Sequence, residues 1–349
     1  MRNSIVLTLF LISSASTQNV WTQMQKIETD DNTGWFGTSV DISGNAMYMI
    51  IGAMREDSFK GAAYIYKRYG EDTNDENIWD RHVDLIGPGL SADDNFWSET
   101  LKVIKKEKID LILPTGDSDM IHFSKNKTIL NDMGITLFQS DYKSINICQD
   151  KFKFYEKCKE KFNLPFTSNE DTDLKFPMFC KPKKGSGSRG VKVCYDITCI
   201  KSLDTSESLH RSSDYIFQEY LPGQEYTIDV LCDMESNPLV VIPRKRLQTK
   251  AGISSKGEII KDDFIEKSCF DMCKFLNLKG PVCLQMKEDV DGVPRFIEVN
   301  PRFGGSTFFT TLAGVNFLPI ILDLVNGCEP KISEPKLIKV VRYYEEIVV

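Results

Sequence analysis

The chain has 349 residues, a length that predicts two or three domains at roughly 150 residues per domain. Its 41% hydrophobic and 27% charged residues are typical of soluble globular proteins, which excludes a disordered chain, a collagen-like repeat and a membrane bundle. The net charge of −7 provides no attraction for a nucleic-acid backbone, so we expect no nucleic-acid partner.

The first residues have the pattern of a secretory signal. A cationic Arg2 precedes the apolar stretch 5–12 and the small residues 14–16, which predicts a signal peptide over residues 1–17. The apolar stretch is far shorter than the ~20 residues that span a bilayer, so no membrane span is predicted.

An internal repeat occurs in the N-terminal part of the chain. Residues 21–40 and 79–96 both run from a tryptophan to an Asp-rich turn and a phenylalanine, and short strands are expected at 38–43, 48–52 and 61–66. This part resembles the FG-GAP repeat of integrin-type β-propellers, with Trp35-Phe36-Gly37 at the namesake motif. The resemblance implies an incomplete, all-β propeller-like segment over 18–96, without the calcium loop of that family.

From Trp97 onward, helical and strand patterns alternate, which predicts a parallel or mixed α/β sheet. Helices are expected at 98–106 and 149–162, and short strands at 110–114 and 135–138. Residues 97–150 are therefore interpreted as a Rossmann-like remnant.

Histidines and cysteines show no ligand or redox pattern. None of the three histidines lies near another histidine or a cysteine at ligand spacing, so zinc chemistry is not predicted. The ten cysteines lie between Cys148 and Cys328 without a CxxC pair. We expect them to be reduced thiols that pack as small apolar side chains.

The first chemical signal is a strand followed by a glycine-rich run. Lys181 lies on the same side of the strand as Phe179, at the strand's end, where its ammonium can meet a phosphate. The glycines within 183–190 allow backbone N–H groups to close over that phosphate. The run is equally well explained as a Gly-Ser linker.

Two further signals lie on strands. Residues 215–230 are expected to form two strands around the turn Pro222-Gly223. The second strand has a polar row of Glu225, Thr227 and Asp229. This row faces either a cleft or, if the strand lies at the edge of the sheet, the solvent. The hairpin 282–302 brings three hard oxygen donors together and predicts a magnesium site beside phosphate. These donors, with Phe296 on their face of the second strand, are Gln285, Glu298 and Asn300.

In this order the three motifs resemble the ATP-grasp superfamily, most closely the carbamoyl-phosphate-synthase-like ligases. The resemblance covers about 97–327 and implies an α+β ATP-grasp domain over 151–330 after an incomplete pre-ATP subdomain, with a C-terminal strand in 331–349. It also implies ATP and Mg²⁺, which Mn²⁺ can replace, as cofactors.

The resemblance assigns roles to individual positions. Lys151 and Lys181 would contact the ATP phosphates, and Arg189 would cover them. Glu219 and the backbone of Leu221 would receive adenine, and Glu225 the ribose hydroxyls. Arg302 would face the transferred phosphate, while the three oxygen donors of the hairpin hold the metal. Because Gln285 stands where many relatives have a carboxylate, a second metal is left open.

The implied activity is a ligase reaction between a small carboxylate and an amine or related nucleophile, through an acyl phosphate. The basic stretch 242–246, with Lys250 and Lys256, is either a clamp for the carboxylate or a solvated face. The competing hypothesis is a secreted or surface FG-GAP-type binding protein with a degenerate or accidentally fused ATP-grasp part. The signal-like N-terminus indicates secretion, whereas ATP chemistry and free thiols indicate the cytoplasm. The oligomeric state stays open.

Overall fold

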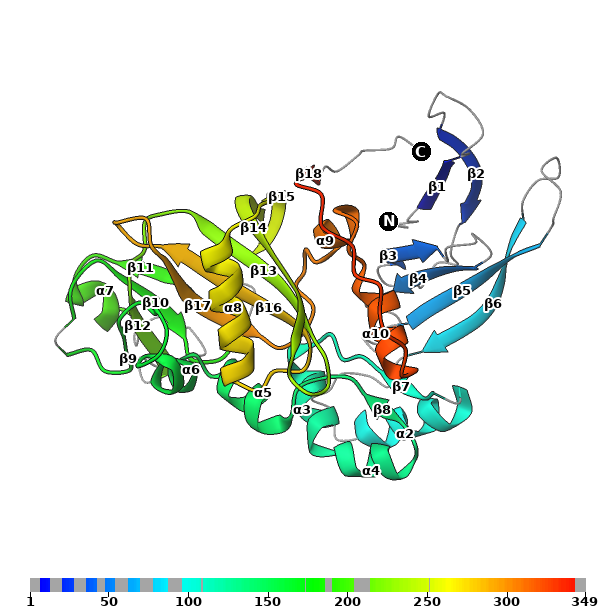
Figure 1. The fold of residues 1–349 in the computed structure, drawn as a ribbon, viewed down its shortest axis with the longest axis horizontal. Coiled ribbons are helices and arrows are strands. Elements are labelled where there is room, and N and C mark those ends of the chain that lie inside the picture. The colour runs from blue at the N-terminus through cyan, green and yellow to red at the C-terminus, as the bar shows by residue number, and fades with distance from the viewer. Residues whose placement is uncertain are drawn as a thin grey trace. The chain divides into compact units, whose positions relative to one another are not determined.

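The chain divides into two units, residues 1–109 and 110–349 (Figure 1). The computed structural model describes six strands between Leu7 and Ile86, the helix at 96–107, and residues 109–342 except 173, 186–189, 204–213 and 251. Arg189 and the predicted glycine-rich loop around it thus lie largely outside the described residues. None of the described helices combines the length and apolar character that crossing a membrane requires.

The described residues of the first unit form two antiparallel sheets and one helix. Strands β1 (Leu7–Ile12) and β2 (Trp21–Ile27) pair with each other. The second sheet has four strands in sequence order, namely β3 (Phe36–Ile42), β4 (Tyr48–Ala53), β5 (Ala62–Tyr69) and β6 (Ile78–Ile86). Helix α2 (Phe96–Glu107) follows. The expected short strands are confirmed, while the signal peptide and the propeller remain predictions.

The second unit contains two larger sheets and a small parallel pair. The pair joins β7 (Leu111–Ile112) to β8 (Thr136–Leu137). The smaller of the large sheets has the order β11 (Lys192–Cys194), β10 (Met178–Pro182), β12 (Tyr215–Glu219), β9 (Thr167–Ser168). The six-stranded sheet has the order β17 (Pro294–Asn300), β16 (Gly280–Glu288), β13 (Glu225–Cys232), β14 (Pro238–Lys250), β15 (Ile253–Ile259), β18 (Lys339–Val341).

Every pairing in the two larger sheets is antiparallel, so the expectation of a parallel or mixed sheet is wrong for them. Short turns join β13 to β14, β14 to β15 and β16 to β17, and such turns impose antiparallel pairing. Within the described residues of this unit, only β7 and β8 run parallel. The fold of this unit is α+β.

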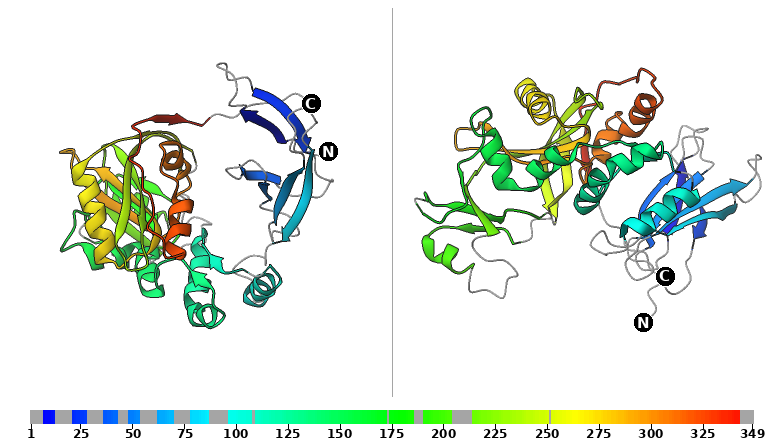
Figure 2. Two further views of the ribbon diagram at one scale, coloured as in Figure 1. Left: turned by 45° about the vertical axis from the view of Figure 1, so that its right-hand side comes forward. Right: turned by 90° about the horizontal axis from the view of Figure 1, so that it is seen from below.

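Helices cover both faces of the six-stranded sheet (Figures 1 and 2). On one face, α5 (Tyr142–Gln149), α6 (Lys151–Cys158) and α8 (Asp263–Phe275) bury a core against β13, β16 and β17. On the other face, α9 (Phe308–Leu312) and α10 (Phe317–Val325) bury a second core. The remaining helices are α3 (Asp117–Lys125), α4 (Lys127–Asp132) and α7 (Ile197–Lys201).

The helix predicted over 149–162 is shorter than expected, because α6 covers only Lys151–Cys158 and the preceding α5 ends at Gln149. Asp150 interrupts the pattern because its carboxylate accepts hydrogen bonds from the backbone N–H groups of Phe152 and Lys153, both at 3.1 Å. A side-chain acceptor at this position satisfies the N–H groups that open a helix. The cap therefore places Lys151 on the first residue of α6.

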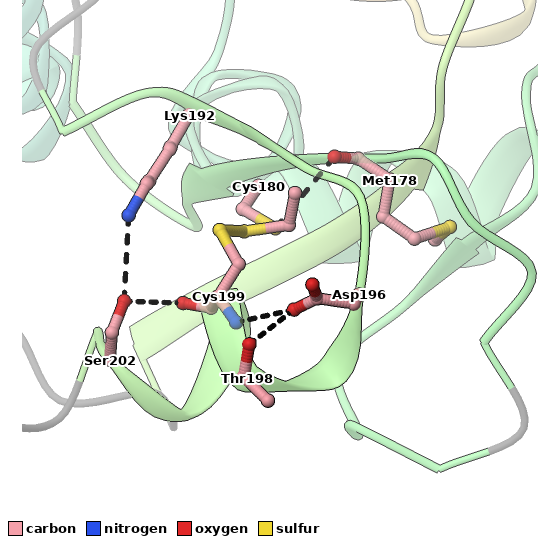
Figure 3. The surroundings of a disulfide bond; sticks show 8 residues. Met178, Cys180, Lys192, Asp196, Thr198, Cys199 and Ser202 are labelled. Carbon is pink, nitrogen blue, oxygen red and sulfur yellow. Dashed lines mark hydrogen bonds between the residues drawn. A yellow bond between two sulfur atoms is a disulfide. The ribbon is translucent and has the colours of Figure 1, made fainter.

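The cysteines are not all reduced thiols. Cys194 and Cys199 form a disulfide (Figure 3) beside the capped start of α7, where the Asp196 carboxylate accepts hydrogen bonds from the Cys199 N–H and the Thr198 hydroxyl. The other eight cysteines are free, and all except Cys328 are buried. The sequence spacing gave no sign of the pair, because two cysteines with four residues between them fit no common framework.

Candidate nucleotide and metal site

A cavity of about 230 Å³ lies between the two larger sheets of the second unit. One wall comes from β10 and β12 of the smaller sheet, and the opposite wall comes from β13, β14, β16 and β17 of the larger one. Seven of the ten predicted site residues line it: Lys151, Lys181, Glu219, Leu221, Glu225, Gln285 and Glu298. The fold thus brings together seven predicted residues that are spread over positions 151 to 298 of the sequence.

Lys181 is the last residue but one of strand β10 and lines the cavity with Phe179, as the period of two predicts. Its ammonium donates a hydrogen bond to the Ile297 carbonyl at 3.1 Å, which links the two sheets. Burial lowers the pKa of Lys181 to about 8, and nearby Glu298 opposes the shift. A buried ammonium without a carboxylate in hydrogen-bond contact is unfavourable, and an incoming anion would relieve it.

Lys151 and the start of the glycine-rich run lie beside Lys181. The Lys151 ammonium donates to the Gly185 carbonyl at 2.8 Å, and its backbone N–H donates to the Lys183 carbonyl at 2.9 Å. Lys184 and Gly185 also line the cavity. Two lysine side chains, Lys151 and Lys181, therefore bring positive charge to this end of the cavity.

The hinge between β12 and β13 forms the opposite end of the cavity. The Glu219 carboxylate accepts from the Phe166 N–H at 3.1 Å and pairs with Arg295 at 3.3 Å, so it is already held in place. Leu221 is buried at the wall. The turn requires glycine at 223, because a Cβ there would lie 2.5 Å from the Glu288 Cβ.

Glu225 opens β13 and has a partner that the sequence did not indicate. The Arg246 guanidinium contacts its carboxylate at 3.1 Å and donates to the Gly252 carbonyl at 2.7 Å. Arg246 also lines the cavity, together with Lys287. By register, Glu225 faces Lys287 on β16.

A β-bulge in β17 shapes the predicted metal site. Gln285 pairs with Glu298, whereas Met286 pairs with Phe296, so Ile297 is an extra residue on β17. Phe296 therefore packs in the core, and the prediction that it shares a face with Glu298 is wrong. Strict alternation fails because the bulge shifts the period by one residue.

A second cavity, of about 160 Å³, adjoins this site. It shares Glu298, Lys151, Lys184 and Gly185 with the first cavity, and Asn300 lines it as well. The opposite wall comes from α3 and α5, with Asp117, Ile121, Cys148 and Gln149. Glu298 is thus common to both cavities, while Gln285 lines the first and Asn300 the second.

Arg302 forms a bidentate ion pair with Asp117, with distances of 2.6 Å from Nε and 3.0 Å from Nη2. Its Nη1 donates to the Phe303 carbonyl at 2.9 Å. Burial acts to lower the pKa of Arg302, but the hydrogen bonds and charge of Asp117 raise it above its usual value. Sequence reasoning missed Asp117, although it lies just after the loop that follows the short strand β7, where residues often carry function.

At Arg244 the basic stretch is neither a solvated face nor an open clamp. Arg244 is fully buried, and its guanidinium contacts the Asp229 carboxylate at 3.2 Å and the Ser306 hydroxyl at 2.7 Å. The Thr307 and Thr310 hydroxyls also donate to Asp229, at 3.0 and 2.6 Å. The polar row of β13 therefore ends in a buried network rather than in a cleft.

Comparisons with known proteins agree with this geometry. The family described as "ATP-grasp in the biosynthetic pathway with Ter operon" matches residues 211–347, and the FG-GAP repeat matches residues 21–66. Among solved structures, the biotin carboxylase–β,γ-ATP complex of Campylobacter jejuni superposes with a TM-score of 0.59 at 14% identity, covering 71% of this chain and 62% of that one. The second unit has an ATP-grasp fold.

Curated relatives extend the similarity beyond the fold. The carbamoyl phosphate synthase large chain of Clostridium acetobutylicum is 24% identical over 282 residues, which are 72% of this chain and 26% of the relative. The D-aspartate ligase of Enterococcus faecium is 25% identical over 280 residues, 69% of this chain and 66% of the relative. The chain thus spans from about a quarter to about two thirds of the length of these relatives.

Proposed function

We propose that the protein is an ATP- and magnesium-dependent ligase that joins a small carboxylate to an amine or related nucleophile through an acyl phosphate. The observation that carries this proposal is the cavity between the two sheets, which has lysines at one end and the Gln285–Glu298 pair beside them. The ligase names of the similar proteins support it.

In this proposal the cavity holds ATP in one orientation. Lys151 and Lys181 face its phosphates, and Arg189 covers them. Glu219 and the Leu221 backbone receive adenine, and Glu225 receives the ribose. The ion pair with Arg246 holds the Glu225 carboxylate through its Oε1 atom, so a ribose hydroxyl can bind the Oε2 atom while that pair stays intact.

The residues present fit a magnesium ion. Gln285 and Glu298 face each other across the ladder, and Asn300 follows two residues later on β17. One carboxylate and two amide oxygens suit magnesium, which binds through few protein oxygens and completes its shell with phosphate and water. When bound, the ion would neutralise charge on the transferring phosphoryl group.

The chain's own residues position the reactants. The γ-phosphoryl group leaves ADP and bonds to the substrate carboxylate; the nucleophile then forms the C–N bond, and phosphate departs. The phosphoryl group carries most of the charge that develops in the transition state. Lysines and hydrogen-bond donors therefore stabilise that state, and no side-chain nucleophile is needed. The predicted contact of Arg302 with that group would require its pair with Asp117 to open.

The test replaces the charged member of the metal set. Glu298→Gln keeps the shape and removes the charge, so we expect phosphoryl transfer to fall by at least ~10² to 10³ with the fold nearly intact. Asn300→Ala should cost less, because water partly replaces a neutral donor. The measurement is ADP release with candidate carboxylates and amines at varied magnesium.

Wild-type turnover and magnesium dependence in Glu298→Gln would place the metal elsewhere and remove the main physical support for the ligase. The FG-GAP match at residues 21–66 favours a second candidate, a surface protein that binds a partner. That candidate predicts no ADP release with any carboxylate and amine.

A further inference from the structure

Glu225 lies between cationic residues on both neighbouring strands, and all three residues line the first cavity. Arg246 approaches it from β14, and Lys287 faces it from β16 in the register of the sheet. The Arg246 guanidinium contacts the Glu225 carboxylate at 3.1 Å, whereas the Lys287 ammonium lies 5.7 Å from the centroid of the Tyr220 ring. Of the two cations, Arg246 therefore holds the carboxylate.

Arg246 is itself fixed by contacts at both ends of the residue. Its Nη2 atom donates a hydrogen bond to the Gly252 carbonyl at 2.7 Å, and its backbone carbonyl accepts one from the Gln224 side-chain amide at 3.1 Å. The Arg246 side chain is 6% exposed. Because the guanidinium is held in one place, its Nη1 atom also holds the Glu225 Oε1 atom in one place.

The exposure of Glu225 separates this ion pair from a purely structural one. Its side chain is 30% exposed, so water can solvate the carboxylate without an arginine, and a pair with an accessible member stabilises a fold little. In the Arg244–Asp229 pair of the same two strands, the side chains are 0% and 1% exposed. The carboxylate of the Arg246–Glu225 pair is thus accessible at the cavity wall, where a ligand can reach it.

We infer that Arg246 is a positioning residue that makes the site selective for ribonucleotides over deoxyribonucleotides. It holds Glu225 through Oε1 and leaves Oε2 to accept hydrogen bonds from the ribose hydroxyls. This inference rests on the proposed function, in which Glu225 receives the ribose. A carboxylate that is already fixed loses less conformational freedom when a ligand binds, so the hydroxyls contribute more to the affinity.

The test compares two nucleotides that differ only in the ribose hydroxyls. Calorimetric titration of the full chain with magnesium measures the dissociation constants of ATP and of 2′,3′-dideoxy-ATP, which lacks both hydroxyls. We expect ATP to bind wild type at least tenfold more tightly, and tenfold corresponds to about 1.4 kcal/mol. Because both nucleotides share the base and the triphosphate, a general distortion of the cavity would weaken both and leave the ratio of the constants unchanged.

Variants assign this ratio to Arg246. Arg246→Met leaves Lys287 as the cation that faces Glu225, and its flexible ammonium pairs with a carboxylate in many geometries. We expect the ratio to fall at least threefold, while the affinity for dideoxy-ATP stays within about twofold of wild type. The matched control is Lys245→Met, because Lys245 is the next cation on β14 but faces Tyr226 and is not among the described residues that line the first cavity. Its ratio should equal that of wild type.

Two further variants keep the inference falsifiable. If Arg246→Met does not fold, Arg246→Lys keeps the charge but replaces the fork-shaped guanidinium with a single ammonium, which should not hold Glu225 and Gly252 together, so the ratio should fall here as well. Glu225→Gln removes the carboxylate, and its ratio should be no higher than that of Arg246→Met.

A wild-type ratio below ten would overturn the inference, and so would a ratio that changes less than threefold in the Arg246 variant that folds. Equal weakening of both nucleotides in that variant would make Arg246 a structural residue only. A ratio that survives in Glu225→Gln would place the ribose elsewhere and overturn the inference as well. Failure of wild type to bind ATP or its analogue AMP-PNP would instead overturn the proposed function.

Discussion

Lys181 illustrates how much one side chain depends on its surroundings. The strand pattern places it in the cavity with Phe179, but its low pKa follows from burial of the ammonium against the second sheet. Among the described residues, that sheet supplies the Ile297 carbonyl as a hydrogen-bond partner. In the proposed function, ATP phosphates provide the missing counter-charge. The protonation state of Lys181 is then coupled to nucleotide binding.

Replacing this lysine tests that role. Lys181→Met should weaken ATP binding by roughly 1.5 to 3 kcal/mol, the range for a charge-assisted hydrogen bond. The control is Lys192→Met, on the neighbouring strand β11, where the exposed ammonium contacts Ser202 at 3.4 Å. Calorimetric titration with ATP measures both, and an unchanged affinity in Lys181→Met would contradict the assignment.

The pH dependence gives an independent prediction. Folding lowers the pKa of Lys181 from 10.5 to about 8, so between these values the unfolded chain binds more protons, and the free energy of unfolding should rise with pH. ATP affinity should fall above pH 8, because the neutral amine no longer compensates phosphate. Urea denaturation and ATP titrations from pH 7 to 10.5 measure both trends. Lys181→Met should lack them.

At the scale of elements, the buried Asp229–Arg244 pair fixes the segment after β17 to the six-stranded sheet. Ser306, Thr307 and Thr310 all bond to it. A Cβ at Gly304 would lie 2.7 Å from the Cys283 Sγ, so this segment lies directly on the sheet. The network therefore stabilises the chain that follows the metal-site strand.

Breaking that pair should be costly. Asp229→Asn leaves the Arg244 guanidinium buried without a counter-charge, and we expect a loss of about 3 to 5 kcal/mol in the free energy of unfolding. The double variant Asp229→Leu/Arg244→Met should lose less, since no buried charge remains. Urea denaturation compares them. A single variant within about 1 kcal/mol of wild type would show that solvent reaches the pair.

Prediction from the sequence succeeded for elements and failed where distant residues meet. Lys181 and the Gln285–Glu298 pair followed from period two and from hairpin geometry. The bulge at Ile297 could not be foreseen, because the residues on either side of it fit a regular strand equally well. Asp117 and Arg302 are 185 positions apart, so their contact arises only from tertiary packing. Arg246, by contrast, lies beside Glu225 in the β13–β14 hairpin, whose register the sequence did not reveal.

At the scale of the whole molecule, the two units differ in kind. Every cavity-lining residue of the proposed ATP site falls in the second unit. The described part of the first unit has six strands in two small sheets and one helix. Sheets of this size bury little apolar surface, which is why we expect the first unit to contribute nothing to nucleotide binding.

Two truncated proteins test whether the first unit is needed for nucleotide binding and whether it folds alone. Removal of residues 1–96 should leave the affinity for AMP-PNP within about twofold, while an isolated fragment of residues 18–96 should be unfolded, because its burial does not offset its ordering entropy. Circular dichroism and proton NMR report on the fragment. A cooperative thermal transition of monomeric 18–96 would contradict the expectation.

The bulge at Ile297 also determines how this region responds to a change in chain length. Deleting one codon, that for Ile297, would leave Phe296 opposite Met286 and Glu298 opposite Gln285 in a regular strand. The core and the metal donors should both survive, but the main-chain carbonyl that receives Lys181 is removed. No substitution achieves this, since every amino acid keeps its carbonyl. A single in-frame deletion would therefore remove the hydrogen bond of Lys181 to Ile297 while the metal donors Gln285 and Glu298 stay paired.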